Sequence, residues 1–103
     1  MEKQGQFTNK KTLFDKNLDF PELPGVYKFF NSKDELIYIG KAKNIKNRVK
    51  SYLNIGKGES KRIAKLKSSI KYIETIITKT ESDALILEQG LISKKRPPFN
   101  IQF

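Results

Sequence analysis

One glutamate stands at a position where a charged side chain is unexpected. Counting by three and four from Glu88 reaches four apolar residues, Ala84, Leu85, Leu91 and Ile92. The carboxylate therefore lies within the apolar stripe of a predicted helix. Burying an unpaired charge costs on the order of several kcal/mol, so a positive partner is expected. That partner is either a metal ion or a basic side chain such as Arg48, and the helix alone favours neither.

The metal chemistry open to the chain is limited by its composition, because the sequence contains neither cysteine nor histidine. Disulfide bonds and thiolate or imidazole metal sites are excluded, and any metal has to be held by oxygen ligands. Oxygen coordination favours Mg²⁺ or Mn²⁺ over Zn²⁺.

Two tyrosines, Tyr27 and Tyr38, lie in short segments rich in β-branched and aromatic residues, 26–30 and 36–39, joined by the turn-forming residues 31–34. This pattern predicts a β-hairpin with the two phenols on adjacent strands. Strands favour tyrosine, so each tyrosine alone is more often a packed core side chain than a catalytic one.

The charge of +10 is concentrated in one part of the chain. Residues 41–71 hold eleven Lys and Arg against the single acid Glu59, which leaves the remainder neutral with ten basic and ten acidic residues. Such a distribution is typical of a surface that faces a polyanion such as double-stranded DNA. A solvated lysine-rich surface is the alternative.

The elements that would position these residues are indicated by capping and turn residues. Asn44, Ser60 and Thr80 precede amphipathic segments and predict helices over 44–53, 60–71 and from 80 to before Pro97. In the second helix, Ile63, Leu66 and Ile70 are expected on the buried side and Lys61, Arg62, Lys65 and Lys67 in solvent. With a strand over 72–78, the order predicts an α+β fold: a small three-stranded antiparallel sheet flanked by about three helices.

A chain of 103 residues is expected to form one domain. Residues 1–20 predict a flexible or loosely packed lead with Phe14, Leu18 and Phe20 as anchors, followed by the ordered domain over 21–103. The N-terminus lacks the apolar core of a signal peptide, and no apolar run approaches the ~20 residues of a membrane span. A soluble, cytoplasmic and monomeric protein is the expectation. Membrane binding through a basic amphipathic helix is disfavoured because the core needs its apolar face.

Four motifs between residue 21 and the end resemble the GIY-YIG nuclease family. They are LPGVY at 23–27, IYIGKAKN at 37–44, RVKSY at 48–52 and PPFN at 97–100, with the helical Glu88 between the last two. The residues of these motifs are specifically similar to those of the N-terminal catalytic domain found in UvrC, a component of bacterial excinuclease. The family has isoleucine where this chain has Val26, which preserves strand packing.

The resemblance implies a metal-dependent DNA endonuclease with five catalytic residues, Tyr27, Tyr38, Lys41, Arg48 and Glu88. Glu88 would hold one divalent cation, Mg²⁺ or Mn²⁺, and Arg48 would face the phosphoryl oxygens. One tyrosine would orient or deprotonate the attacking water with help from Lys41 and the metal, and the sequence leaves open which one. Three further residues, Gly40, Tyr52 and Asn100, are expected to support the pocket.

In that family, water attacks in line and the products carry 5′-phosphate and 3′-hydroxyl ends. The incision implied is the one on the 3′ side in nucleotide excision repair, with other excinuclease proteins as partners. The duplex would be gripped without sequence readout by seven basic residues, Lys43, Lys46, Lys50, Lys61, Arg62, Lys65 and Lys67.

Other functions remain open beside this one. A complete excinuclease protein of this kind would continue into a partner-binding segment and a second nuclease domain, so the chain is either an excised domain or a free-standing nuclease with another role. A non-catalytic DNA-binding module on the same fold is the third hypothesis. It is disfavoured because every expected polar position carries the chemically competent residue type.

Overall fold

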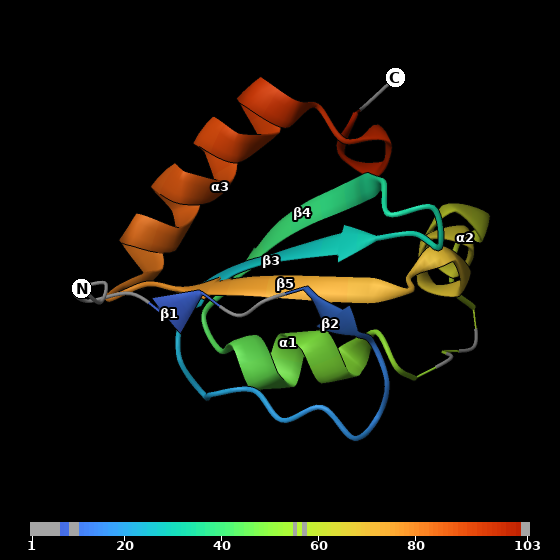
Figure 1. Cartoon of the computed structure of the whole chain (residues 1–103), viewed down its shortest axis with the longest axis horizontal. Helices are drawn as coiled ribbons and strands as arrows, with labels where there is room; N and C mark the ends of the chain where they lie inside the picture. The colour runs from blue at the N-terminus through green and yellow to red at the C-terminus, as the bar shows by residue number, and fades with distance from the viewer. Residues whose placement is uncertain (1–6, 9–10, 55, 57, 102–103) are drawn as a thin grey trace.

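Five strands, three α-helices and a 3₁₀ turn follow one another along residues 7–8, 11–54, 56 and 58–101, which are the residues that the computed structural model describes (Figure 1). They are β1 (Phe7–Thr8), β2 (Thr12–Leu13), β3 (Gly25–Phe30), β4 (Leu36–Ala42), α1 (Ile45–Ser51), α2 (Lys61–Ser69), β5 (Tyr72–Ile77), α3 (Glu81–Lys95) and η1 (Pro98–Asn100). The predicted α+β class and order of elements are confirmed. The two short N-terminal strands are additions to the prediction.

The sheet has the strand order β1-β5-β3-β4, with β2 also paired to β5, and all pairings are antiparallel. The register pairs Tyr27 with Gly40 on β4 and with Thr75 on β5. β4 continues past the predicted segment 36–39 to Ala42, because Gly40, Lys41 and Ala42 still pair with β3. Among the described residues β4 has a strand neighbour on one side, so it forms an edge of the sheet.

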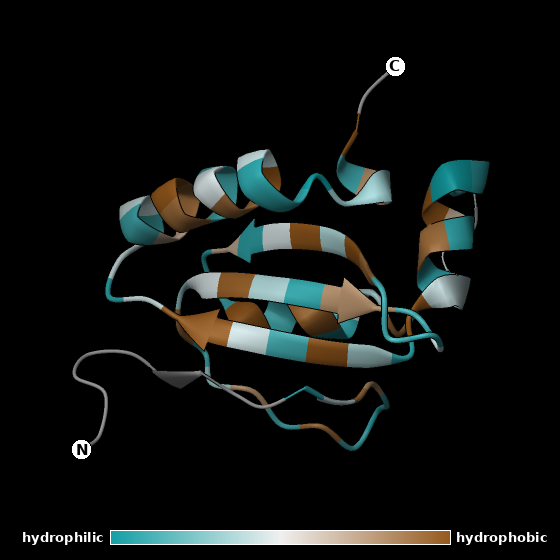
Figure 2. Cartoon of the chain, turned by 45° about the horizontal axis from the view of Figure 1, so that its top comes forward, coloured by the Kyte–Doolittle hydropathy of each residue, from teal (hydrophilic) through white to brown (hydrophobic). Residues whose placement is uncertain are grey.

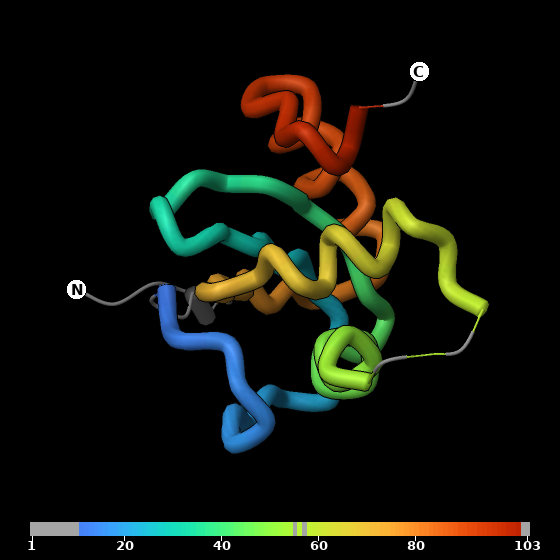
Figure 3. Tube along the Cα trace, turned by 90° about the vertical axis from the view of Figure 1, so that its right-hand side faces the viewer, coloured from blue at the N-terminus to red at the C-terminus, as the bar shows by residue number. Residues whose placement is uncertain are grey.

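Strand alternation gives the sheet two apolar faces, each covered by a helix. One core cluster joins the strands to α1 and includes Tyr27, Phe29, Ile45, Val49 and Ile73. The other joins them to α3 and consists of Val26, Ile39 and Ala84. Figure 1 shows α3 and α1 on opposite sides of the strands, Figure 2 shows apolar and polar residues alternating along them, and Figure 3 views α1 end-on.

The helices begin where the sequence indicates. The side chains of Asn44, Ser60 and Thr80 each accept a hydrogen bond from the backbone N–H three residues later, at 3.0, 3.2 and 3.0 Å. Each therefore satisfies one of the N–H groups that a helix start leaves without an intrahelical partner. α1 and α2 both end two residues before the predicted boundary.

The predicted buried side of α2 is correct for Leu66 and wrong for Ile63. Leu66 is 3% exposed, whereas Ile63 is 40% exposed. The helix lies beyond the end of the strands (Figure 1), so a narrow stripe of it reaches the core. Lys67, expected in solvent, has a side chain only 16% exposed because it pairs with Glu59.

The N-terminal residues that the structure describes lie against the sheet. β1 and β2 pair with opposite ends of β5. Phe20 is buried, and Phe14 and Leu18 pack partly buried against the same cluster, which confirms the three anchors. Within the described ranges, no helix combines the length and the apolar character needed to cross a bilayer.

Candidate active site

Tyr27 lies at the centre of a group of aromatic and basic side chains on the α1 face of the sheet. Its side chain is fully buried, and its hydroxyl is 2.9 Å from the hydroxyl of Tyr52 at the end of α1. Arg48 Nε of α1 donates to the same hydroxyl at 3.4 Å. Burial raises the pKa of Tyr27 well above its usual range, and the nearby phenols of Tyr52 and Tyr38 raise it further. Tyr27 is therefore a neutral hydrogen-bonding centre.

Gly40 makes room for the Tyr27 ring. A Cβ added at Gly40 would lie 2.4 Å from both Cζ and the hydroxyl oxygen of Tyr27, well inside van der Waals contact. The two residues face each other across β3 and β4. A glycine is therefore required at position 40 because the Tyr27 ring approaches the backbone so closely.

Tyr38 continues the aromatic group toward the sheet edge on β4. Its ring lies 6.1 Å from that of Tyr27 and 6.2 Å, nearly parallel, from that of Phe29. Burial raises the pKa of Tyr38 to about 12, Tyr52 contributes to the rise, and the charge of Arg48 opposes it. Tyr38 is half-buried and thus more accessible to substrate than Tyr27.

Arg48 projects from α1, whose buried residues Ile45 and Val49 fix the helix on the sheet. The Tyr27 phenol raises the pKa of Arg48, so the guanidinium stays charged. Its hydrogen bond to Tyr27 uses Nε, and the two terminal nitrogens have no hydrogen bond to any of the described residues. They form a fork suited to two oxygens of one phosphate.

A groove of about 430 Å³ runs beside Arg48 and is lined by Lys41, Ala42, Lys43, Asn44, Asn47, Arg48 and Ser51. Lys41 follows Tyr38 by three residues, so strand alternation places these two side chains on opposite faces of β4. Lys41 thus reaches the groove from the α3 side of the sheet. The groove is open and bordered by positively charged side chains, which suits a phosphodiester backbone.

Glu88 lies on α3 and is half-buried. Of the apolar stripe predicted around it, Ala84 is buried and Leu91 and Ile92 are partly buried, whereas Leu85 is exposed. Its negative charge contributes to raising the Tyr38 pKa, which places the carboxylate within electrostatic reach of the tyrosine group. Among the described residues it makes no hydrogen bond and no ion pair, so the alternative of a simple pair with Arg48 is not realised there. The same residues contain no group of three or more potential acidic ligands. A cation here would therefore complete its coordination with water and substrate oxygens rather than with a cluster of carboxylates from the described residues.

Asn100 supports the site through the backbone of β4. Its side-chain NH₂ donates to the carbonyl of Ile39 at 2.8 Å, and its Oδ1 accepts from the N–H of Ile39 at 2.8 Å. The amide thereby occupies the position that a further strand would take beside this edge. Ile39 lies between Tyr38 and Gly40, so Asn100 holds the part of β4 that carries both.

The seven basic residues predicted to contact DNA have different environments. Lys43, Lys50, Lys61 and Lys65 are exposed. Lys46 pairs with Asp19 at 3.5 Å. Arg62 donates to two backbone carbonyls, those of Phe99 and Ile101.

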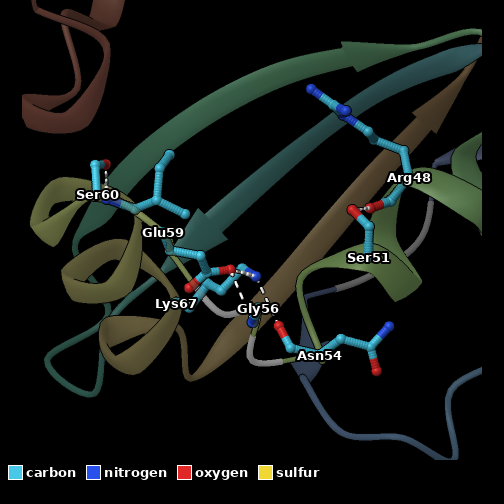
Figure 4. Close-up of polar contacts among 8 residues, drawn as sticks. Arg48, Ser51, Asn54, Gly56, Glu59, Ser60 and Lys67 are labelled. Carbon is cyan, nitrogen blue, oxygen red and sulfur yellow. Dashed lines mark hydrogen bonds and ion pairs between the residues drawn. The ribbon is translucent and has the colours of Figure 1, made fainter.

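Lys67 fastens the connection between α1 and α2. Its ammonium pairs with Glu59 and donates to the carbonyl of Asn54 at 2.6 Å (Figure 4). Glu59 also accepts from the N–H of Gly56 at 3.2 Å, and the pair with Lys67 lowers the pKa of Glu59. The ammonium group of Lys67 is thus occupied by contacts within the protein.

Two side chains near the site are absent from the sequence-based prediction. Phe29 packs edge-on against Tyr52, with ring centroids 4.8 Å apart, and supports both Tyr52 and Tyr38. The alternation of β3, which places residues 27 and 29 on one face, is the signal that identifies it. Ser51 donates to the carbonyl of Arg48 at 2.6 Å and lines the groove, and no pattern in the sequence indicates this.

Known proteins match this chain over most of its length. Residues 23–101 match the family model described as UvrC-like GIY-YIG domain. The UvrABC system protein C of Bdellovibrio bacteriovorus is 50% identical over 88 residues, which are 85% of this chain and 14% of that protein. That of Clostridium tetani is 53% identical over 81 residues, 79% of this chain and 13% of that protein. The chain thus spans about a seventh of the length of these relatives.

Solved structures match as well. The GIY-YIG N-terminal endonuclease domain of UvrC from Thermotoga maritima, bound to magnesium as its catalytic divalent cation, is 43% identical with a TM-score of 0.68, over 79% of this chain and 86% of that one. A variant of bacteriophage T4 EndoII has a TM-score of 0.62 at 21% identity, over 93% of this chain and 92% of that one, which shows a shared fold alone. By its family match and these identities, the chain belongs to the UvrC-like GIY-YIG domain family.

Proposed function

We propose that this chain is an endonuclease domain that hydrolyses a phosphodiester bond of double-stranded DNA with the help of one Mg²⁺ or Mn²⁺. The observation that carries the proposal is a half-buried carboxylate, Glu88, that has no partner among the described residues and lies within electrostatic reach of a tyrosine and arginine network. The related domain from Thermotoga maritima binds magnesium as its catalytic cation, which supports the proposal.

The residues present fit a hard divalent cation. Glu88 offers an oxygen ligand of the type that Mg²⁺ and Mn²⁺ prefer, and one carboxylate with water and phosphate oxygens is a usual arrangement for Mg²⁺ in phosphate sites. We assign Glu88 as the residue that holds the cation. A bound divalent cation supplies Lewis-acid stabilisation of the charge that develops on the phosphate oxygens.

Arg48 would stabilise the pentavalent transition state from the side opposite the cation. Its Nε is held by the Tyr27 phenol, which in turn bonds Tyr52, so the guanidinium is oriented before substrate binds. The terminal nitrogens then meet two phosphoryl oxygens without reorganisation. Tyr27 and Tyr52 act as orienting groups, and Lys41 contributes a further positive charge at the groove.

Tyr38 would accept the proton of the attacking water. Both phenols are protonated near neutral pH, since an ordinary phenol has a pKa of about 10 and burial raises the pKa of each further. The rise is smaller for Tyr38, to about 12, and Tyr38 is also the more exposed of the two. Arg48 opposes the rise in pKa at both phenols, so the smaller net rise and the greater exposure are what make Tyr38 the better general base. The reactive form of Tyr38 would be its phenolate, a minority species that forms when the phenol releases its proton to solvent. The phenolate would take a proton from water as the water oxygen bonds to phosphorus, the P–O3′ bond breaks, and the departing 3′ oxygen takes a proton from solvent water.

The exposed lysines of α1 and α2 would hold the DNA backbone without reading sequence. Lys43, Lys50, Lys61 and Lys65 have the exposure that this role needs, with Lys46 as a weaker contributor because of its pair with Asp19. Phosphate contacts of this kind position the duplex and make the affinity depend on salt.

We further propose that the incision serves nucleotide excision repair, on the 3′ side of a lesion, in the cytoplasm and together with other excinuclease proteins. The similarity to UvrABC system protein C supports this. We place the nuclease domain at 21–103, acting as a monomer. Of the predicted lead 1–20, residues 7–8 and 11–20 lie against the sheet, and the others lie outside the described residues. A free-standing nuclease with another role is the alternative.

Cleavage of supercoiled plasmid tests the proposal. Cutting is expected with Mg²⁺ or Mn²⁺ and is expected to be absent with a chelator. Glu88→Gln should lower the rate by more than about a hundredfold, the scale of one electrostatic catalytic group, while DNA affinity stays nearly unchanged. Glu81→Gln, the same change at an exposed position of the same helix, is the control and should cut like the parent.

Two results would count against the proposal. DNA binding without any metal-dependent cutting would identify a non-catalytic binding module. Undiminished cutting by Glu88→Gln would reject Glu88 as the metal ligand.

A further inference from the structure

Arg62 of the helix α2 binds the segment that carries Asn100. The terminal nitrogen Nη2 of Arg62 donates to the carbonyl of Phe99 at 2.7 Å and to the carbonyl of Ile101 at 3.1 Å. These are the carbonyls on either side of Asn100. The guanidinium also lies 5.7 Å from the centre of the Phe99 ring. Arg62 thus fixes the backbone from which the Asn100 side chain projects.

Asn100 in turn holds β4, the strand that carries Tyr38 and Gly40 and is called the catalytic strand below. Its amide makes two 2.8 Å hydrogen bonds to the N–H and carbonyl of Ile39 on the edge strand β4. Ile39 is fully buried, so without Asn100 its two backbone groups would lose their partners away from water. A displacement of Asn100 would therefore disturb the residues next to Ile39, namely Tyr38 and Gly40.

We propose that Arg62 is a positioning residue for the catalytic strand, which acts through Asn100, and that its guanidinium is not a DNA contact. The inference rests on the proposed nuclease function, since Tyr38 and Gly40 are the positions that it affects. Arginine is suited to this role because one planar group bonds two carbonyls and stacks on a ring at once. Lysine offers a point charge on a flexible stem and cannot reproduce both.

The charge-conserving variant separates this role from DNA binding. A lysine at position 62 keeps the positive charge that a phosphate contact needs, and loses the two-carbonyl contact. Arg62→Lys should therefore cut DNA about tenfold more slowly at saturating substrate, with an unchanged dissociation constant for DNA; the loss is on the scale of one or two hydrogen bonds. Arg62→Gln should show the same loss of rate.

Arg96 provides the matched control. It is an exposed arginine at the end of α3, close in sequence to the same segment, and its side chain has no hydrogen bond to any described residue. Arg96→Lys and Arg96→Gln should retain the parental rate at saturating substrate. A double-mutant cycle with Asn100→Ala adds a second test: if Arg62 acts through Asn100, Arg62→Gln should lower the rate less than about twofold in the Asn100→Ala background.

Amide hydrogen exchange of Ile39 gives a readout that does not depend on cutting. Exchange at the Ile39 N–H should become faster in Arg62→Lys and Arg62→Gln, and remain parental in the Arg96 variants. If the parent protein does not cut DNA, the proposed function fails while this measurement still tests the link from Arg62 to β4. Parental exchange and rate in Arg62→Lys, together with weaker DNA binding in Arg62→Gln, would overturn the inference and make Arg62 a DNA contact.

Discussion

Replacing Gly40 by alanine is expected to separate the packing of the site from its chemistry. The added Cβ would lie 2.4 Å from Cζ and the hydroxyl oxygen of Tyr27, whereas ordinary contact begins at 3.4 Å. The ring must therefore move by roughly 1 Å, and it is fully buried among Phe29, Tyr38 and Tyr52. Overpacking of this kind costs about 1–3 kcal/mol of unfolding free energy.

The same displacement would remove the hydroxyl of Tyr27 from its hydrogen bonds with Tyr52 and Arg48. Because Arg48 loses its orientation, cutting should fall by about a hundredfold in the soluble, folded variant. A smaller side chain opposite should relieve the clash, so Gly40→Ala combined with Tyr27→Leu should recover part of the stability that the single change loses, and none of the activity.

Urea denaturation followed by circular dichroism measures the unfolding free energy, and plasmid cleavage measures the rate. Gly90→Ala is the control, because a Cβ at Gly90 meets nothing within 4 Å and alanine is favoured over glycine in a helix by roughly 0.5–1 kcal/mol. A Gly40→Ala protein as stable and active as the parent would refute the close approach. So would a double variant in which the two losses of stability simply add.

Three further predictions concern pH and salt. Burial raises the pKa of Tyr38 to about 12, so if Tyr38 is the base, the rate of cutting should rise about tenfold per pH unit from neutral pH to about 9. Tyr38→Phe should abolish cutting at every pH. A pH profile that is unchanged in that variant would contradict the assignment. The same raised pKa means that the folded state binds this proton more tightly, so the associated stability is fully present below pH 10 and declines as the pH rises toward about 12, which urea titration in alkaline buffers measures. Changing Lys61 and Lys65 together to alanine should weaken DNA binding and reduce the slope of log affinity against log salt by about two. Fluorescence anisotropy at several salt concentrations measures this slope, and a parental slope would show that this face of α2 does not touch phosphate.

Local signals account for the parts of the fold that the sequence predicts correctly. The hairpin follows from two apolar runs around a turn, and the helix starts follow from Asn44, Ser60 and Thr80, whose side chains each bond a backbone group three residues away. Interactions of this range can be inferred from spacing alone.

The features that the sequence does not reveal depend on contacts between distant segments. β1 and β2 are two residues each and exist because they pair with β5, more than fifty residues later in the chain. The bonds from Asn100 to Ile39 span 61 residues. Ile63 fits an apolar helical pattern but lies where α2 extends past the sheet, so its exposure is a tertiary effect. The pairing of Lys67 with Glu59 likewise depends on how the chain turns before α2.

Arg48 and Glu88 are held apart, and this separation leaves both charges available to ligands. An arginine and a carboxylate that formed an ion pair would satisfy each other and occupy the space for a phosphate. Arg48 belongs to the helix on one face of the sheet and Glu88 to the helix on the other, with the edge strand β4 between them. Tyr27 bonds the guanidinium on its own side, and no described residue pairs with the carboxylate. In the proposed function, a phosphate with a divalent cation would supply the complement to both charges at once, whereas the exposed lysines would hold the DNA backbone whether or not the metal is bound.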